Sequence, residues 1–252
     1  MPPKDTVNTL ARGTSPLLGA VALVTGGNRG IGRAIALRLA ELGASVAICG
    51  RDAQALAATE AELKKSGTLI HSQLADVSLA ADVTALVDKA QAALGPISIL
   101  VNNAGIGLFG PAHEKTEADW DRVLNTNLKS VFLVSRAVAP AMIRRGTGDI
   151  INISSLAGRN AFAGGGIYCA SKWGLQGLSA CMAEDLREHG IRVSVICPGS
   201  VATGFSTGSA RGPKDPAKVL SPEDVAHAVE MIVTQSPQSF LSEVHVRPLR
   251  KP

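Results

Sequence analysis

The 252-residue chain is poor in aromatic residues, which make up 3% of it and include a single tyrosine. So few aromatic side chains exclude a base-stacking platform for single-stranded nucleic acid. The Lys and Arg residues are scattered, without the basic run that is typical of nucleic-acid binding. The net charge of +4 instead suits an anionic cofactor or substrate. No apolar stretch is long enough to span a bilayer, so we expect neither a nucleic acid nor a membrane as a partner.

Cysteine is also scarce, with four residues and no CxxC pair among them. Each cysteine lies inside or beside an apolar run, so we interpret all four as reduced core residues and expect neither a disulfide nor a metal site. This usage is typical of a cytoplasmic protein. Residues 1–15 lack the apolar core of a signal peptide. We expect residues 1–17 to form a flexible arm before a single domain at residues 18–252.

Apolar runs that favour buried strands alternate with helical patterns along the chain. Strands are predicted at residues 21–24, 46–49, 69–75, 97–101, 150–153, 192–197 and 244–246. Helices are predicted at residues 33–42, 53–65, 80–94, 118–145, 167–189 and 222–234, the second of them capped by Asp52. This alternation predicts an α/β fold of the Rossmann type: a doubly wound parallel sheet of about seven strands with helices on both faces.

Glycine-rich and polar residues follow six of the predicted strands. They occupy residues 25–32, 50–51, 76–77, 102–105, 154–155 and 198–199. In doubly wound sheets, ligands bind at the carboxyl ends of the strands. The sequence therefore predicts one ligand site along this edge of the sheet.

The first of these segments is a glycine loop between a strand and a helix. Its glycines are Gly26, Gly30 and Gly32, with Asn28, Arg29 and Ile31 between them, a spacing that differs from GxGxxG. Glycine lets the backbone turn sharply and approach a pyrophosphate, which the N–H groups of a helix N-terminus then bind. A purely structural turn is the alternative. The motif GxxxxGK[ST] is absent, which excludes a P-loop nucleotidase.

The end of the second strand bears on the choice of cofactor. A carboxylate there accepts a hydrogen bond from the ribose 2′-OH of NAD, whereas a basic side chain suits the 2′-phosphate of NADP. The strand ends in Gly50, Arg51 follows, and Arg29 lies in the glycine loop. Asp52 is the competing residue, but its position suits a helix cap better. We therefore predict that NADP(H) is preferred over NAD(H).

Tyr168 and Lys172 lie one turn apart on the same predicted helix. A phenol holds its proton until about pH 10, and a nearby ammonium is expected to lower that pKa and make the phenol usable in proton transfer. The hydroxyl of Ser155, at a strand end, is placed to bond the same reacting oxygen. By itself the pair also fits an ordinary amphipathic helix.

In this order, and at these strand ends, the motifs resemble those of the short-chain dehydrogenase/reductase family. The resemblance runs from about residue 18 to about residue 246. It rests on Thr25-Gly26, Gly30-Ile31-Gly32, Asn102-Asn103-Ala104-Gly105, Asn127, Ser155, Tyr168, Lys172, Pro198-Gly199-Ser200-Val201-Ala202-Thr203.

The resemblance implies a catalytic role for four residues. Tyr168 is the expected general acid, which protonates the carbonyl oxygen as a hydride arrives from the nicotinamide. Ser155 is expected to hydrogen-bond that oxygen, the neighbouring Ser154 being less favoured. Lys172 is expected to hold the nicotinamide ribose. Asn127 is expected to anchor a water in the proton relay, with Asn125 as the alternative.

The resemblance also implies the cofactor contacts and the assembly. The implied contacts are Asp76 and Val77 at the adenine, Asn103, Ala104 and Gly105 at the adenosine ribose, and Val201 and Thr203 at the nicotinamide carboxamide, with Pro198 and Gly199 in the motif that precedes them. A homodimer or homotetramer built on the two long helices is expected. The pattern is similar to 3-oxoacyl-carrier-protein reductases. The positions of their paired arginines correspond here to Gly146, which follows Arg144-Arg145, and to His189, so the match is partial and an acyl carrier protein is a candidate partner.

The resulting hypothesis is an NADPH-dependent reductase that turns a ketone or 3-oxoacyl thioester into a secondary alcohol. The alternatives are an NAD-dependent alcohol dehydrogenase and a non-catalytic dinucleotide-binding sensor. A sugar-nucleotide epimerase would need a larger C-terminal region. Substrate specificity is expected from residues 162–166 and from residues 201–221, the second as a mobile lid because it is rich in Gly, Ser and Pro.

Overall fold

The computed structural model describes residues 15–206, 215 and 218–250. Residues 1–14 of the expected N-terminal arm, and residues 207–214 and 216–217 of the expected lid at residues 201–221, therefore lie outside the described residues. Leu17, the last residue of the expected arm, is buried, and its N–H donates to the carbonyl of Leu42 at 2.9 Å. Leu17 thus packs with the domain.

Seven strands form one sheet in the order β3-β2-β1-β4-β5-β6-β7, and every neighbouring pair is parallel. The strands are β1 (Val21–Thr25), β2 (Ser45–Gly50), β3 (Ile70–Leu74), β4 (Ile99–Asn102), β5 (Gly148–Ile153), β6 (Ile191–Pro198) and β7 (Glu243–Val246). The strand order reverses between β1 and β4, where such sheets bind ligands. The predicted fold class is confirmed.

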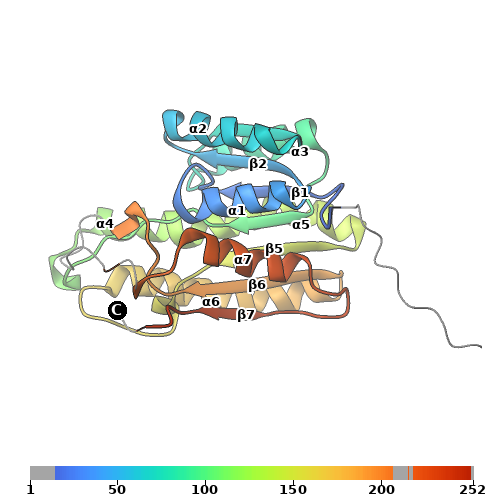
Figure 1. The fold of residues 1–252 in the computed structure, drawn as a ribbon. Coiled ribbons are helices and arrows are strands. Elements are labelled where there is room, and N and C mark those ends of the chain that lie inside the picture. Colours follow the sequence, from blue (N-terminus) through green and yellow to red (C-terminus); the bar gives the residue numbers. More distant parts are fainter. Residues whose placement is uncertain (1–14, 207–214, 216–217, 251–252) are drawn as a thin grey trace, which may run out of the picture.

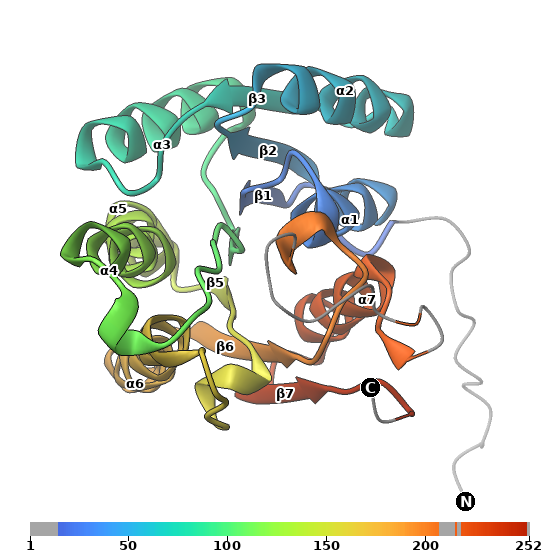
Figure 2. The ribbon, with the colours of Figure 1, turned by 90° about the vertical axis from the view of Figure 1, so that its left-hand side faces the viewer.

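Helices cover both faces of this sheet, as Figure 2 shows along the strand axes. One face carries α1 (Gly30–Glu41), α2 (Ala53–Leu63) and α7 (Pro222–Val233), and the other carries α3 (Ala80–Leu94), α5 (Ser130–Arg145) and α6 (Gly166–Arg187). Successive strand residues point to opposite faces. Accordingly, Ala22 and Val24 of β1 belong to the core under α1 and α7, whereas Val21 and Leu23 belong to the core under α3 and α5.

The helix expected at residues 118–145 is present over the whole segment, with an interruption of its α-helical pattern near the middle. Helix α4 (Glu117–Leu124) is followed by a π-helical turn at Asn125–Lys129 before α5 begins. Inside this turn the amide of Asn127 bonds both the N–H and the carbonyl of Ile106, at 2.8 and 2.9 Å. We attribute the interruption to these bonds, because π-turns commonly carry a side chain that a regular helix would misplace. The predicted helical stretch is therefore confirmed, and the π-helical turn inside it was not predicted.

Two smaller expectations have different outcomes. Asp52 caps α2 as predicted, since its Oδ1 accepts the N–H of Ala55 at 3.0 Å. Cys49, Cys169 and Cys197 are buried, but Cys181 is exposed on the outer side of α6, so the expectation of four core cysteines is wrong for this one. In the described part of the chain, no helix combines the length and the apolar character needed to cross a bilayer.

Candidate active site

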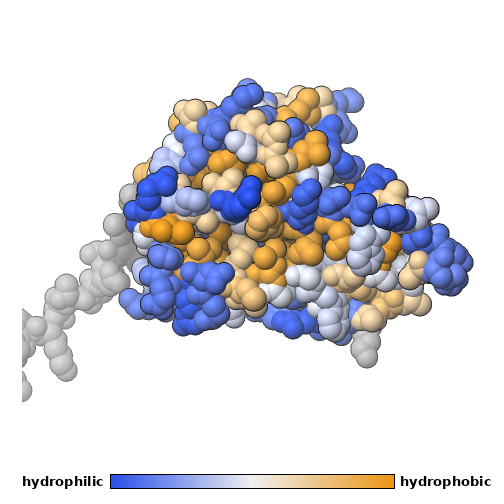
Figure 3. All heavy atoms as spheres, turned by 180° about the vertical axis from the view of Figure 1, so that it is seen from behind, coloured by the Kyte–Doolittle hydropathy of each residue, from blue (hydrophilic) through white to orange (hydrophobic). Residues whose placement is uncertain are grey.

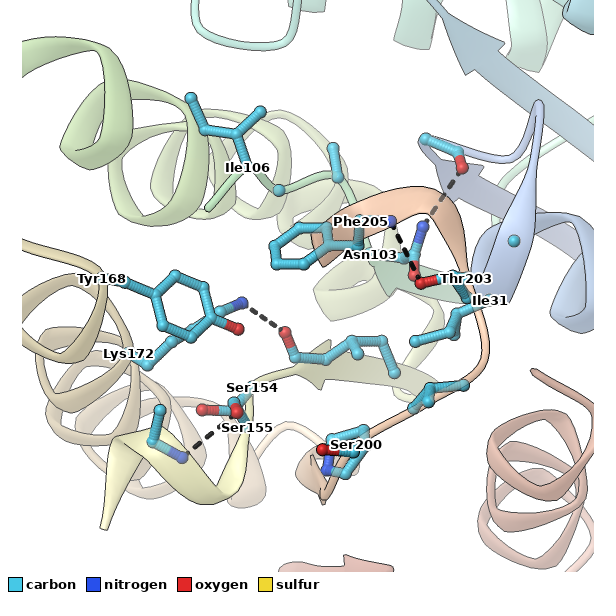
Figure 4. Close-up of a pocket in the computed structure, with 18 of the residues that line it drawn as sticks. Ile31, Asn103, Ile106, Ser154, Ser155, Tyr168, Lys172, Ser200, Thr203 and Phe205 are labelled. Carbon is cyan, nitrogen blue, oxygen red and sulfur yellow. Dashed lines mark hydrogen bonds between the residues drawn. The ribbon is translucent and has the colours of Figure 1, made fainter. Parts of the chain in front are cut away.

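A cavity of about 1390 Å³ opens at the carboxyl ends of the strands. Figure 2 looks onto this edge of the sheet, and Figure 4 shows part of the cavity wall. The cavity is lined by Ser155 and by each predicted cofactor residue: Gly26, Asn28, Arg29, Gly30, Ile31, Gly32, Arg51, Asp76, Val77, Asn103, Ala104, Gly105, Tyr168, Lys172, Pro198, Gly199, Val201 and Thr203. The structure thus brings together residues from loops after six strands.

The glycine loop leaves its backbone open to the cavity. Gly26 and Gly30 have φ angles of 63° and 53°, which side-chain-bearing residues rarely adopt. At Gly32, a Cβ would lie 2.2 Å from the carbonyl oxygen of Gly26. The loop is held by Asn103, whose Nδ2 donates to the carbonyls of Thr25 and Gly26 at 3.0 and 3.2 Å. Asn103 therefore braces the loop as well as lining the cavity.

This loop fits the pyrophosphate of a dinucleotide. Helix α1 begins at Gly30, and the side chain of its N-cap residue, Arg29, makes no capping hydrogen bond in the described structure. The first N–H groups of the helix therefore face the cavity without a side-chain acceptor, which is the arrangement that binds phosphate at helix N-termini. Thr203, from the loop after β6, lies against Gly30, where an added Cβ would be 3.3 Å from the Thr203 methyl group.

At the β2 and β3 ends of the cavity, basic and acidic groups lie side by side. Arg51 Nη1 is 3.4 Å from Asp76 Oδ2, and the Arg51 side chain is half exposed. Burial raises the pKa of Asp76, but hydrogen bonds from Ser78 and the charge of Arg51 outweigh it and hold this pKa below its ordinary value. The carboxylate of Asp52 is engaged in its helix cap. Arg51 is thus the charged group best placed to meet a ligand after β2.

Tyr168, Lys172 and Ser155 converge at the other end of the cavity (Figure 4). Tyr168 and Lys172 come from α6, and Ser155 follows β5 as the N-cap of a short 3-10 turn, where its Oγ accepts the N–H of Ala157 at 3.1 Å. The Ser155 hydroxyl also hydrogen-bonds the Tyr168 phenol. Lys172 Nζ donates to the carbonyl of Ile153 at 2.8 Å.

Burial sets the protonation of this pair. It raises the pKa of Tyr168 to about 12, although the hydrogen bond with Ser155 lowers it in part. Burial also lowers the pKa of Lys172 to about 8. The expectation that Lys172 lowers the phenol pKa is therefore not met among the described residues, because desolvation of a phenolate at this site is the larger effect.

Ser154 and Ser155 have different surroundings. The Oγ of Ser154 is buried and has no hydrogen-bond partner in the described structure. The hydroxyl of Ser155 bonds Tyr168 instead. The geometry therefore favours Ser155 as the serine that acts with the tyrosine.

Asn127 lies behind the cavity wall rather than on it, and its neighbour Thr126 is the lining residue. Its side chain is 1% exposed, and besides bonding Ile106 it donates to Ser171 Oγ at 3.1 Å. Asn127 thus braces the loop after β4 against α6. Its expected role as a water anchor stays a prediction.

Phe109 and the C-terminal residues of the wall were not predicted, whereas Phe205 lies in the segment 201–221 from which substrate specificity was expected. Around Tyr168, the ring of Phe109 lies 5.5 Å away edge-on and that of Phe205 lies 5.9 Å away. The chain contains only five Phe residues, and this scarcity is the one feature of the sequence that could have drawn attention to these two rings. The C-terminal residues Arg247 to Arg250 line the cavity as well, and no motif in the sequence pointed to them.

A cluster beside the cavity contains possible metal ligands. Ligand atoms of Cys197, Glu243 and His245 lie within 4.8 Å of one another. However, the Glu243 carboxylate already accepts two hydrogen bonds from Arg159, at 3.0 and 2.6 Å, and one nitrogen of His245 lies 2.9 Å from it. Arg159 is the main reason that the pKa of Glu243 falls to about 2. We interpret the cluster as an ion-pair network.

Several known proteins are similar to this chain in sequence and in fold. The family model described as short chain dehydrogenase matches residues 20–213. The (3R)-3-hydroxyacyl-CoA dehydrogenase of Canis lupus familiaris is 39% identical, over 87% of this chain and 91% of its own. A metagenomic short-chain oxidoreductase, solved in complex with NADP, is 45% identical with a TM-score of 0.82 and covers 94% of this chain and 100% of its own. An NAD⁺-bound xylitol dehydrogenase is 30% identical with a TM-score of 0.84 and covers 92% of this chain and 99% of its own.

Proposed function

The chain belongs to the short-chain dehydrogenase family of oxidoreductases, and on this premise we propose that it reduces a carbonyl compound to a secondary alcohol with NADPH. The observation that carries the proposal is the convergence of Ser155, Tyr168 and Lys172 at one end of a cavity whose other end is a glycine loop. A non-catalytic binding protein has no need of these three groups together.

The chemistry of the protein's own residues follows from their protonation. NADPH, when bound, supplies the hydride. Tyr168 keeps its proton at neutral pH because its pKa is about 12, and it donates that proton to the carbonyl oxygen as negative charge develops there. Ser155 donates a hydrogen bond to the same oxygen. The rings of Phe109 and Phe205 pack against the ring of Tyr168.

The preference for NADPH rests on Arg29 and Arg51. Both line the cavity near the end of β2, where Gly50 offers no carboxylate and Asp52 is engaged as a cap. A guanidinium pairs with a phosphate through two parallel hydrogen bonds. The NADP complex of the metagenomic relative supports this preference, whereas the NAD⁺-bound xylitol dehydrogenase shows that both cofactors occur on similar folds.

A ketone or a 3-oxoacyl thioester is the proposed substrate. The hydroxyacyl-CoA dehydrogenase relative supports a thioester. An acyl carrier protein would dock on basic residues, and Arg144 at the end of α5 is exposed, whereas Arg145 donates to the carbonyls of Pro96 and Ile97. Of the two arginines that precede Gly146, Arg144 is thus the one available to a carrier.

NADPH consumption tests the function. A 3-oxoacyl thioester is offered on carrier protein and as a small thiol ester, beside a panel of simple ketones. We expect turnover of at least one substrate. If the carrier docks, the rate of NADPH consumption should be much higher with the thioester on carrier protein than with the small thiol ester. Binding of NADPH without turnover of any carbonyl in the panel would contradict the proposal.

We further propose a homodimer or homotetramer. Trp173 of α6 is 54% exposed, and Trp120 of α4 and Phe132 of α5 are 48% and 45% exposed. Figure 3 shows a hydrophobic band on the side of the molecule where α5 and α6 lie. Exposed aromatic rings on adjacent helices favour an interface. Sedimentation of the native chain and of Trp173→Lys tests this, and a monomeric native chain would contradict it.

A further inference from the structure

The segment after β7 forms part of the cavity wall. Arg247, Pro248, Leu249 and Arg250 all line the cavity. In Figure 1 the end of β7 lies at the same edge of the molecule as the loop that leads into α6. The cavity wall here therefore comes from the last described residues of the chain.

This segment is fixed to the loop after β6. Pro198 pairs with Val246 in the sheet, and the N–H of Gly199 donates to the carbonyl of Val246 at 2.8 Å. The Pro248 ring packs so closely on Gly199 that a Cβ there would lie 2.9 Å from Pro248 Cδ. These contacts hold Arg247, which lies between Val246 and Pro248, at the cavity.

The charges along the cavity are distributed unevenly. At the β1 to β3 end, the charged residues in the described wall are of both signs: Arg29, Arg51, Asp52 and Asp76. At the β5 to β7 end, the charged residues in the described wall are Lys172, Arg247 and Arg250, all of one sign. A cleft lined by one sign of charge concentrates ligands of the opposite sign.

The two arginines are available to a ligand. Within the described part of the chain, Arg247 and Arg250 make no hydrogen bond or ion pair, and both side chains are exposed. The carboxylate nearest in sequence, Glu243, is held by Arg159 and lies outside the cavity wall. Nothing described therefore neutralises these guanidinium groups.

We propose that Arg247 and Arg250 form a subsite for an anionic group of the substrate. The inference rests on the proposed function and narrows its substrate class to carbonyl compounds that carry a carboxylate or phosphate away from the reacting carbon. Guanidinium groups suit both anions, since each presents paired oxygens. Tyr168 and Ser155 then act at the carbonyl while the arginines hold the opposite end of the molecule.

The test compares matched substrates that differ in charge. One arm uses ω-keto acids of increasing chain length against their methyl esters. The other uses acetoacetyl-CoA against the neutral acetoacetyl thioester of N-acetylcysteamine. We expect the native enzyme to prefer the anionic member in one arm. A preference in the keto-acid arm identifies the anionic group as a carboxylate, and a preference in the CoA arm identifies it as a phosphate. In Arg247→Ala/Arg250→Ala, we expect kcat/KM for that member to fall roughly 10- to 100-fold more than for its neutral partner, mainly through KM.

The matched control is Arg122→Ala/Arg187→Ala, which removes two positive charges from residues outside the described cavity wall. This control should leave the ratio of kcat/KM for the anionic substrate to kcat/KM for its neutral partner unchanged. Arg247→Lys/Arg250→Lys should retain part of the preference for the anionic substrate. The proposal would be overturned if the native enzyme gave a kcat/KM ratio, anionic to neutral, at or below one in both arms. It would also be overturned if this ratio were the same in the Ala variant as in the native enzyme.

A binding measurement separates this subsite from catalysis. Dicarboxylates and CoA, which carry no reducible carbonyl, are titrated into NADPH-saturated native protein and the Ala variant, with thermal stability as the readout. We expect one of them to stabilise the native protein and to lose this effect in the variant. If no substrate is turned over but this difference persists, the proposed function fails and the subsite stands. Equal shifts in both proteins would overturn the subsite.

Discussion

The ammonium nitrogen of Lys172 lies 5.9 Å from the centre of the Tyr168 ring, and its hydrogen bond goes to the carbonyl of Ile153. Both side chains are more than nine-tenths buried. In this environment the phenol retains its proton more firmly, and the amine less firmly, than either does in water. Both shifts suit the proposed role of Tyr168, which is to donate a proton to the substrate.

Tyr168 can be titrated directly, because it is the only tyrosine in the chain. In the folded protein without cofactor or substrate, the ultraviolet absorbance of the phenolate should show a titration midpoint near pH 12, because burial raises the pKa of Tyr168. Ser155→Ala should move the midpoint higher, because it removes a hydrogen bond that lowers this pKa. A midpoint at or below that of free tyrosine would contradict the role of burial.

Lys172 should make stability depend on pH. Its folded pKa is about 8, below the ordinary value of about 10.4, so between these values the unfolded chain binds a proton that the folded chain has released. The free energy of unfolding should therefore rise with pH across this window, by about 3 kcal/mol in total. This contribution of Lys172 to the free energy of unfolding is fully present above about pH 10.4 and is lost as the pH falls through about 8.

Lys172→Met removes this titration and is the control. Chemical denaturation of both proteins from pH 7 to 10.5 isolates the lysine, because other groups titrate in both. The native-minus-variant difference in unfolding free energy should climb over this range. A difference that stays flat would show that the lysine is not desolvated as the structure indicates.

The sequence predicted the sheet and the cavity wall well, for a physical reason. Short apolar runs, glycine turns and caps such as Asp52 act locally, and parallel strands bring their carboxyl ends to one edge whatever lies between them. The interruption at Asn125–Lys129 depends instead on Asn127 bonding Ile106, a contact that only the folded chain creates. The Tyr168 pKa was mispredicted because spacing shows the neighbouring charge but not the depth of burial.

The C-terminal wall escaped prediction for a similar reason. Arg247 and Arg250 follow a short strand and belong to no motif, so the sequence assigned them no role. Only the pairing of β7 with β6 brings them to the cavity. Likewise, the outward direction of Trp173 and Cys181 on α6 could not be read from a helix with apolar residues on several sides.

Arg51 should decide between the two cofactors. Arg51→Ala should weaken NADPH binding roughly 10- to 100-fold, the effect of losing a hydrogen bond to a charged group, and leave NADH binding within about twofold. Fluorescence titration of both cofactors measures this. Arg122→Ala, on α4 and outside the described cavity wall, is the control. Equal losses for the two cofactors would contradict recognition of the 2′-phosphate.

Gly32→Ala should damage the glycine loop, because its Cβ would lie 2.2 Å from the Gly26 carbonyl oxygen. We expect about 1–3 kcal/mol of destabilisation, as for other overpacked sites, together with loss of NADPH binding. Gly177→Ala, on the exposed side of α6 with no atom within 4 Å of the new Cβ, should gain about 0.4–1 kcal/mol. Thermal melts and cofactor titration distinguish the two variants. A Gly32→Ala variant with native stability and native NADPH binding would mean that the loop has more room than the structure shows.

The most direct test of the account is a single-turnover measurement of NADPH oxidation by the native protein and by Tyr168→Phe, with the best carbonyl substrate and with the NADPH dissociation constant measured for each. Removing the general acid should slow the reaction by about 10²–10⁴-fold or more, while the NADPH dissociation constant changes little because the ring is kept. A Tyr168→Phe enzyme that retains a rate within tenfold of the native one would contradict proton donation by Tyr168, and with it the proposed mechanism.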